Sequence, residues 1–323
     1  MINKELKVVV LAGGKSKRMK SIRSKVVHEI LGKKIINFLL DSLIEAGVDE
    51  HNIIIVCGEN IEEIRSSVKK NVNYAIQKEQ LGTCDALLSA KEFIEDFKGD
   101  LIVTVGDNPY INSCELKKLI SNHKKKGSEC TFISAIFPDV PPPYGRVIRN
   151  EKKEVIGVVE EIDATEEQLK IREVNSSIYI FNNKIVFPLL YEIDNKNEKE
   201  EYYLTDIIKV LKRKLFSVDA VIADDYFISI GINNRWELQQ AQERFNRENL
   251  KKLSIENGVT ILQPETVCIE YDVNIGRDTI IYPSTYIASG TKIGRNCKIG
   301  PFVYLENVEI KDNEKVSFEK REG

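Results

Sequence analysis

The stretch that decides the fold is residues 7–25, KVVVLAGGKSKRMKSIRSK. Its apolar start, residues 8–11, predicts a buried strand that ends at the glycine pair Gly13-Gly14. Basic side chains follow directly, at Lys15, Lys17, Arg18, Lys20, Arg23 and Lys25. Glycine lets backbone N–H groups come close to a ligand, and cations neutralise the charge of phosphates. The stretch therefore predicts a strand that opens into a phosphate-binding loop.

Three known phosphate-binding motifs were compared with this loop. A Walker A loop needs G-x-x-x-x-G-K-[ST], and Val9 stands where its first glycine belongs. The dinucleotide motif G-x-G-x-x-G fails as well, because Lys15 and Arg18 replace its later glycines. The remaining pattern, L-A-G-G-x-x-x-R-M with Lys25 downstream, is similar to the signature of sugar-phosphate nucleotidyltransferases. The simpler alternative is a strand, a turn and a helix with solvated lysines.

Composition and charge narrow the class of protein. The 323 residues are enough for about two domains. Charged residues of both signs make up 30% of the chain and leave a net charge of -3, which predicts no nucleic-acid partner. No secretion signal is apparent, and no apolar run reaches the roughly 20 residues of a membrane span. The six cysteines include no C-x-x-C pair, so we expect a cytoplasmic protein with reduced thiols and no membrane partner.

Strand and helix patterns alternate over the first two thirds of the chain. Apolar runs predict strands at 53–56, 73–76 and 101–105. Periodic apolar residues predict helices at 35–46, 60–70, 84–97 and 112–126. Thr83 is placed to cap the third of these helices. The alternation predicts an α/β fold with a Rossmann-like, doubly wound mixed sheet, in which Gly13-Gly14 and Gly106-Asp107 end neighbouring strands and face one site.

The pattern then changes twice. Further strands are expected at 146–149, 154–160 and 174–181, followed by a helix at 202–213 and a long polar helix at 234–254. Aliphatic residues next recur at intervals of six, at Ile269, Ile275, Ile281, Ile287, Ile293, Ile299 and Leu305. This period is typical of a short left-handed parallel β-helix. We therefore expect a nucleotidyltransferase domain at 1–233, a linker helix at 234–254 and the β-helix at 255–323.

Short segments of residues 1–310 resemble those of one family and occur in the same order along the chain. They are LAGGKSKRM with Lys25, Gln77 with QLGT at 80–83, GDNP at 106–109, YGR at 144–146, VEEIDA at 159–164, EVNS at 173–176, EYYLTD at 201–206 and GINNR at 231–235. The family is the bacterial N-acetylglucosamine-1-phosphate uridylyltransferases, the uridylyltransferase half of the bifunctional enzymes that make UDP-N-acetylglucosamine. Their fold is of the nucleotide-diphospho-sugar transferase type.

The resemblance implies a reaction and a role for each matching residue. UMP passes from UTP to a hexosamine-1-phosphate, foremost N-acetylglucosamine-1-phosphate, and pyrophosphate leaves. Arg18 and Lys25 are the implied catalytic residues, and Asp107 and Asn233 the implied Mg²⁺ ligands. The implied nucleotide-binding residues are Leu11, Ala12, Gly13, Gly14, Gln77, Gly82 and Thr83. Among them, the amides of 12–14 would cradle the nucleotide, and Gln77 and Gly82 would read the edge of the uracil base. The implied sugar-binding residues are Gly145, Glu160 and Asn175.

The chain departs from the family pattern at several site positions. Ser16 and Lys17 replace glycine and threonine, Ser24 replaces proline, Cys84 replaces glycine, Asp85 replaces histidine and Ser177 replaces glycine. These changes leave two alternatives open: another sugar-1-phosphate as substrate, or a non-catalytic regulatory subunit that binds nucleotide sugars.

The repeat region carries two further expectations. No histidine follows His123, so the usual base for acyl transfer is missing and we expect no acetyltransferase activity. Left-handed β-helices of the resembled family commonly form homotrimers, and a short one leaves both a homotrimer and a monomer open.

Overall fold

The structure, a computed structural model, describes residues 6–323 in two units. The first unit contains residues up to Val27 and Ile35–Gly231. The second contains His28–Lys34 and Ile232–Gly323. The border thus falls at Gly231, close to the expected border at residue 233. The segment 28–34 joins the second unit, which no local sequence pattern indicates.

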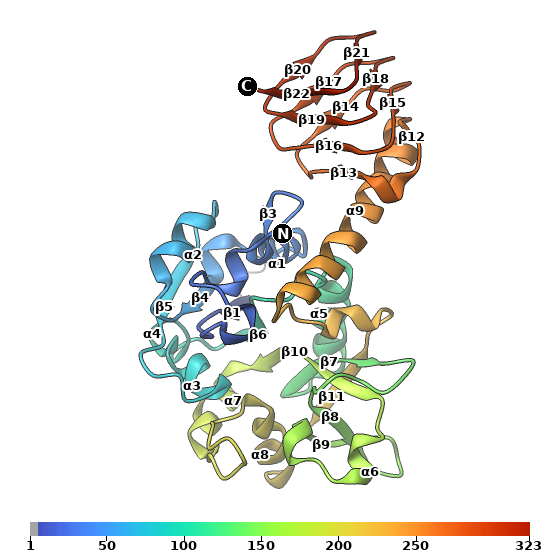
Figure 1. Cartoon of the computed structure of the whole chain (residues 1–323). Helices are drawn as coiled ribbons and strands as arrows, with labels where there is room; N and C mark the ends of the chain where they lie inside the picture. The colour runs from blue at the N-terminus through green and yellow to red at the C-terminus, as the bar shows by residue number, and fades with distance from the viewer. Residues whose placement is uncertain (1–5) are drawn as a thin grey trace. The chain divides into compact units, whose positions relative to one another are not determined.

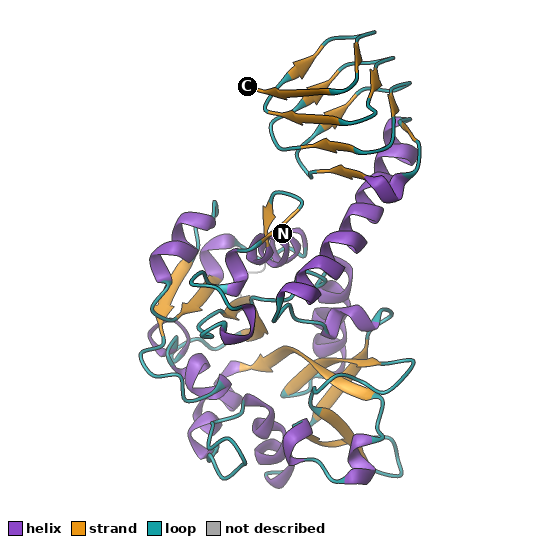
Figure 2. Cartoon of the chain, in the orientation of Figure 1, coloured by secondary structure: helices purple, strands orange, loops and turns teal. Residues whose placement is uncertain are grey.

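A mixed nine-stranded sheet forms the centre of the first unit in the described part of the chain (Figures 1 and 2). Its main order is β11-β7-β10-β6-β1-β4-β5, and β8 and β9 pair beside β10. Strands β4, β1 and β6 run parallel, whereas β10 is antiparallel to both β6 and β7. The strands are β1 (Leu6–Leu11), β4 (Ile53–Cys57), β5 (Asn73–Ile76), β6 (Asp100–Val105), β7 (Cys130–Ile136), β8 (Arg146–Arg149), β9 (Val155–Val159), β10 (Glu173–Asn182) and β11 (Val218–Ile222). The predicted mixed sheet is confirmed.

Both faces of this sheet are covered by helices, so β1 is buried on both sides. Val9 packs into one apolar cluster, and Val8 and Val10 pack into the other, because successive strand side chains point to opposite faces. Helices α3 (Thr83–Leu88), α4 (Lys91–Ile94), α7 (Asn183–Leu189) and α8 (Ile207–Arg213) contribute to the cluster of Val9. Helices α1 (Ile35–Glu45), α2 (Ile61–Ser67) and α5 (Ser113–Lys126) contribute to the other, and α6 spans Glu166–Leu169.

Two helix predictions need correction at residues that lie near the candidate site. The helix expected at 84–97 is divided into α3 and α4, and Thr83 does not cap it. The Thr83 hydroxyl instead accepts a hydrogen bond from Leu204 N at 2.9 Å. The helix expected from residue 202 begins as a regular α-helix only at Ile207. Tyr202 is held outside a helix because its N–H donates to Leu81 O at 2.7 Å and its carbonyl accepts from Cys84 N at 2.9 Å.

The second unit combines a hairpin, a long helix and a parallel β-helix. The hairpin consists of β2 (Glu29–Ile30) and β3 (Lys33–Lys34), and α9 spans Arg235–Asn257. Three parallel sheets form the faces of the β-helix. Their strands are β12 (Thr260–Ile261), β13 (Val267–Ile269), β14 (Asn274–Ile275), β15 (Ile280–Ile281), β16 (Thr285–Ile287), β17 (Lys292–Ile293), β18 (Lys298–Ile299), β19 (Val303–Glu306), β20 (Glu309–Ile310), β21 (Lys315–Val316) and β22 (Glu319–Glu322).

The hexapeptide period predicted the interior of the β-helix. All seven aliphatic residues from Ile269 to Leu305 are buried in one apolar cluster, as expected for side chains that point into the solenoid. The spacing shortens after Leu305, where Ile310 pairs with Ile293 and takes the next buried position. None of the helices within residues 6–323 combines the length and the apolar character that crossing a bilayer requires.

Candidate functional site

The ends of β1, β4 and β6 bring the glycine pair and Asp107 to the same edge of the sheet. The Ala12 N–H donates to Val56 O at 2.8 Å, and the Gly106 N–H donates to Leu11 O at 2.9 Å. These bonds hold the chain just beyond Leu11 between its two neighbouring strands. They also correct the prediction that the amides of residues 12–14 bind the nucleotide. The Ala12 N–H is already hydrogen-bonded within the sheet, so only the N–H groups of Gly13 and Gly14 remain for that role.

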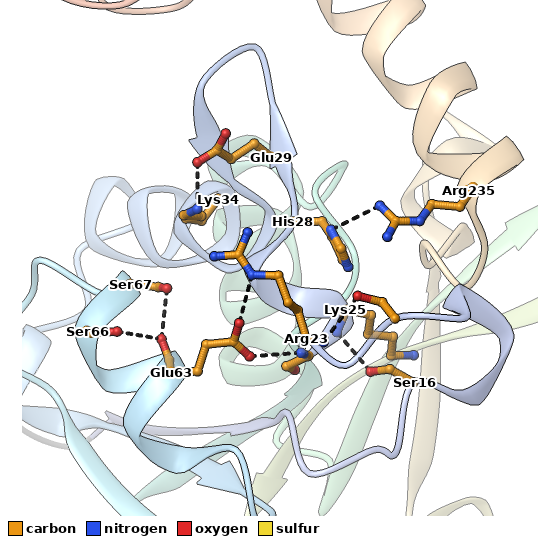
Figure 3. A network of polar contacts seen from close by, with 12 residues as sticks. Ser16, Arg23, Lys25, His28, Glu29, Lys34, Glu63, Ser66, Ser67 and Arg235 are labelled. Atoms are coloured by element: carbon orange, nitrogen blue, oxygen red, sulfur yellow. Dashed lines mark hydrogen bonds and ion pairs between the residues drawn. The ribbon is translucent and has the colours of Figure 1, made fainter.

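The loop after the glycines is anchored by one buried residue and exposes its cations. Met19 is fully buried, while Lys17 and Arg18 are exposed in the same short 3-10 turn. Ser16 adopts a φ of 52°, a left-handed conformation that costs a non-glycine residue about 1–2 kcal/mol. Its hydroxyl accepts a hydrogen bond from Lys25 N at 2.8 Å, which closes the loop (Figure 3). Serine thus adopts here the backbone conformation for which glycine is the usual residue.

Helix α2 fixes the far end of this loop. Glu63 accepts from Arg23 Nε at 3.0 Å and from Ser24 N at 2.9 Å, and Figure 3 shows both bonds. No motif marks Glu63 in the sequence, because a carboxylate on a helix surface has no pattern of its own. Its two bonds restrict the backbone directly before Lys25. Figure 3 also shows Arg235 with His28 at 3.3 Å, a pair that lies within the second unit.

Lys25 and Asp107 form an ion pair between Lys25 Nζ and Asp107 Oδ2. Their side chains are only 21% and 12% exposed, so water screens the pair less than it screens a surface pair. Gly231 lies directly against Asp107, and a Cβ at Gly231 would lie 3.0 Å from Asp107 Oδ1. The structure therefore brings together two predicted site residues from distant parts of the sequence.

The predicted Mg²⁺ ligands do not lie in the same unit. Asp107 belongs to the first unit and Asn233 to the second, so their shared coordination of a metal stays a prediction. Within residues 6–323, no group of three or more His, Cys, Asp and Glu side chains could hold a metal ion. A carboxylate and an amide oxygen are nevertheless the donor type that Mg²⁺ prefers, especially when substrate phosphates supply further ligands. The donor chemistry thus fits a metal that binds together with a triphosphate.

The predicted base-reading residues lie together beside Gly13. Gln77 directly follows β5. Its side-chain Nε2 donates to Asp85 Oδ2 at 2.8 Å and to Gly82 O at 3.2 Å. A Cβ at Gly13 would lie 2.7 Å from Gln77 Oε1. Gln80 also contacts the loop, since its Nε2 donates to Gly13 O. Gln80 and Asp85 were missed as site residues, although Gln80 belongs to the QLGT segment that carried the resemblance and Asp85 is one of the departures from the family pattern.

The predicted sugar-binding residues also converge. Asn175 N donates to Gly145 O at 2.9 Å, and a Cβ at Gly145 would lie 3.4 Å from Glu160 Oε1. Thr205 donates its hydroxyl hydrogen to Glu160 Oε1 at 3.0 Å. A cavity of about 320 Å³ adjoins this cluster and is lined in part by Glu160, Tyr203 and Thr205. Gly145, Glu160 and Asn175 thus lie around one place, as a shared ligand would require.

Burial governs the charge of the Glu160 carboxylate. Burial raises the pKa of Glu160 above its usual value, and the hydrogen bond from Thr205 only partly opposes this shift. The backbone next to it is held by Arg146, which is 2% exposed and whose Nη1 donates to Pro142 O at 3.1 Å and to Tyr144 O. Arg146 therefore shapes the turn that ends at Gly145. Its position in the YGR segment was a signal for this role.

Residues 202–205 connect the base-reading residues with the sugar-binding residues. Tyr202 packs its backbone on Gly82, Thr83 accepts from Leu204 N, and Thr205 donates to Glu160. A continuous run of backbone and hydroxyl contacts thus joins the base-reading residues to the sugar cluster. Ser177, next to that cluster, adopts a φ of 57° and donates its N–H to Asn175 Oδ1 at 3.2 Å. Like Ser16, it replaces a family glycine and takes a left-handed backbone conformation.

Sequence comparisons agree with this geometry. The family described as nucleotidyl transferase matches residues 7–237, which include the first unit from residue 7 onward and the start of α9. This chain belongs to the nucleotidyl transferase family. A second family, the bacterial transferase hexapeptide with six repeats, matches residues 272–311 of the same chain. The predicted family resemblance and the predicted repeat region are both confirmed.

Curated relatives of this nucleotidyl transferase carry the name "Bifunctional protein GlmU". The protein from Clostridium botulinum is 42% identical over 306 residues, which cover 94% of this chain and 65% of the relative. The protein from Caldanaerobacter subterraneus is 40% identical over 297 residues, 92% of this chain and 64% of the relative. The protein from Acetivibrio thermocellus is 41% identical over 311 residues, 96% of this chain and 67% of the relative. The chain thus spans about two thirds of the length of these relatives.

Proposed function

We propose that this protein transfers UMP from UTP to a hexosamine-1-phosphate, foremost N-acetylglucosamine-1-phosphate. The sugar-phosphate oxygen attacks the α-phosphorus of UTP, the bond between the α-phosphorus and the bridging oxygen breaks, and pyrophosphate leaves. The observation that carries the proposal is the Lys25–Asp107 pair, which lies where the glycine loop leaves the sheet. The family match and the base-reading and sugar clusters in the same unit support it.

Alignment and neutralisation of charge account for the roles of the basic residues. Transfer of a phosphoryl-type group demands little covalent chemistry from the protein, so positioning and electrostatics supply most of the rate. Arg18 is an exposed cation on the loop and is free to follow the triphosphate tail. Lys25 is less exposed and is held by the loop bonds at Ser16 and Ser24, which suits a cation next to the reacting α-phosphate.

Mg²⁺ is the proposed cofactor, with Asp107 and Asn233 as its protein ligands. When bound, the ion would offset the charge that develops on the phosphates. Asp107 is well placed for such a role because its carboxylate lies at the end of β6 with little water around it. Lys25 lies beside the same carboxylate, so its ammonium group is held close to where the phosphates would bind.

Sugar recognition is assigned to Gly145, Glu160 and Asn175. An ionised Glu160 accepts hydrogen bonds from sugar hydroxyls, while Thr205 holds one of its oxygens. Gly145 leaves space beside that carboxylate, which any larger residue would occupy. A site that is built to bind hydroxyl groups rejects analogues that lack them by large factors. The identity of the sugar is therefore decided at this cluster.

The experiment is pyrophosphate release by the full chain across a panel of nucleoside triphosphates and sugar-1-phosphates with Mg²⁺. We expect the highest rate with UTP and N-acetylglucosamine-1-phosphate. Asp107→Ala should abolish turnover and keep the far-ultraviolet circular dichroism, whereas Asp96→Ala, which removes an exposed carboxylate elsewhere, should leave the rate unchanged. Nucleotide-sugar binding without turnover on any pair would instead support a regulatory subunit, and another preferred sugar would reassign the substrate.

The proposal includes two statements about the repeat region. The chain has no acetyltransferase centre of the usual kind, since no histidine follows His123, and acetylation of glucosamine-1-phosphate from acetyl-CoA by the purified chain would contradict this. A homotrimer forms through the β-helix, where Phe302 and Phe318 stack at 5.5 Å and are 62% and 73% exposed. Exposed apolar pairs of this kind support an interface. Light scattering that gives a monomer at high concentration would exclude the trimer.

A further inference from the structure

The orientation of the Gln77 side-chain amide is determined by its hydrogen-bond partners. Its Nε2 lies 2.8 Å from Asp85 Oδ2 and 3.2 Å from Gly82 O. A carboxylate and a carbonyl are both acceptors, so only the NH₂ group of the amide can face them. The reversed amide would oppose its oxygen to two other oxygens. The amide oxygen, Oε1, must therefore point away from Asp85.

The Oε1 atom points to the end of β1. The absent Cβ of Gly13 leaves room for it, since a Cβ at that position would lie 2.7 Å away. No hydrogen bond to Oε1 occurs within residues 6–323, although Gln77 is only 6% exposed. An acceptor atom that no protein donor occupies is open to a donor from a ligand. A ligand with an N–H donor at this place would supply the missing hydrogen bond.

Asp85 makes this orientation stronger than Gly82 could alone. A hydrogen bond to an ionised carboxylate is shorter and about twice as strong as one between neutral groups, and the bond to Asp85 is the shorter of the two. Asp85 is also one of the residues at which this chain departs from the family pattern. A histidine could act as a donor or an acceptor, whereas an ionised aspartate can only accept.

We propose that Asp85 is a positioning residue that sets the preference for the base of the nucleotide. It holds Gln77 so that an acceptor faces the base, which favours uracil because the N3 atom of uracil carries a hydrogen. The N3 atom of cytosine is itself an acceptor, and its lone pair would face Oε1. The inference rests on the proposed function, with UTP as the substrate and its base beside Gln77 as the family resemblance implies. Asp85 itself does not contact the base and acts through Gln77.

The experiment measures the dissociation constants of UTP and CTP by titration calorimetry on the full chain with Mg²⁺. We expect wild-type protein to bind UTP at least tenfold more tightly than CTP. Asp85→Ala should reduce this ratio about tenfold, mainly through tighter binding of CTP, because the amide of Gln77 is then free to reverse. Asp85→Asn should retain part of the ratio, since its amide oxygen still accepts. Glu79→Gln removes a nearby exposed charge without touching Gln77 and should leave the ratio unchanged.

A second series separates positioning from a general effect on folding. In the Gln77→Ala background, Asp85→Ala should no longer change the ratio of the two dissociation constants, because the residue through which it acts is gone. Equal binding of UTP and CTP by wild type, or an unchanged ratio in Asp85→Ala, would overturn the inference. Failure of the proposed function would be seen differently. No sugar phosphate would then give pyrophosphate release, although the protein would still bind UTP more tightly than CTP.

Discussion

Replacing Gly82 by alanine tests whether the contact between residues 81–84 and Tyr202 organises the site. Gly82 has a φ of 127°, a conformation that side chains rarely adopt. An added Cβ would lie 2.4 Å from Tyr202 O and 2.7 Å from Tyr202 N. Both atoms belong to the backbone, so a side-chain rotation cannot relieve the collision. The two chain segments would have to separate.

The size of the effect follows from these contacts. This backbone conformation, with φ 127° and ψ -178°, is essentially restricted to glycine and costs another residue about 2 kcal/mol. Separation also breaks the hydrogen bonds from Tyr202 N to Leu81 O and from Cys84 N to Tyr202 O, each of which contributes about 1 kcal/mol. We therefore expect Gly82→Ala to lower the free energy of unfolding of the first unit by about 3–4 kcal/mol. Nucleotide binding should weaken as well, because Gly82 O holds Gln77.

Urea unfolding gives the measurement. Far-ultraviolet circular dichroism follows the helices of both units, whereas the fluorescence of Trp236, the single tryptophan, reports on the second unit. A loss of dichroism that Trp236 does not follow therefore belongs to the first unit. Gly157→Ala in β9 is the matched control, since a Cβ there meets nothing within 4 Å, and it should stabilise the protein by about 0.5 kcal/mol. An unchanged unfolding midpoint in Gly82→Ala, or an equal loss in Gly157→Ala, would refute the reasoning.

Three other changes test the sugar cluster and the repeat region. Since burial raises the pKa of Glu160 above 4.5, lowering the pH through that raised pKa should protonate it and increase the KM for the sugar phosphate, and Glu160→Gln should lack this acidic rise in KM. Because the pKa of Glu160 is higher in the folded than in the unfolded state, its ionisation lowers the free energy of unfolding as the pH rises from 4.5 through the folded-state pKa. Glu160→Gln cannot ionise, so its free energy of unfolding should fall less than that of the wild type over this pH range. Ser177→Gly should raise the unfolding free energy by up to about 1 kcal/mol, because it removes the left-handed strain at φ 57°, and a lower midpoint would contradict this. Ile287→Ala should cost the second unit about 3 kcal/mol in the Trp236 signal, because Ile287 is fully buried in the β-helix.

Much of the fold could be predicted because it follows from short-range patterns. The apolar run before Gly13-Gly14 is β1, and the interval of six residues marks the buried positions of the β-helix. The helix starting after Asn112 was also predictable, since its side chain accepts from Glu115 N at 3.0 Å and Gly127 ends it. In each case the residues that determine the element lie within a few positions of one another.

Predictions failed where distant segments compete for the same backbone groups. A helix was predicted from residue 202, but the backbone of Tyr202 pairs with Leu81 and Cys84, and Leu204–Asp206 form only a 3-10 turn before α8. The Ala12 N–H was expected to bind nucleotide, but it completes the ladder with Val56. Glu63, Gln80 and Asp85 are ordinary polar residues by sequence, and their importance comes from the atoms that they contact.

The amino-acid sequence alone determined which chemical groups the site contains: a glycine pair after a buried strand, a series of cations, and carboxylates at predictable strand ends. Only the tertiary structure decided how those groups are used. It paired Lys25 with Asp107, placed Gly145 against Glu160, and turned the amide of Gln77 by means of Asp85. The physical reason is that a hydrogen bond or an ion pair depends on distance and direction, and packing of remote segments, rather than local sequence, sets both.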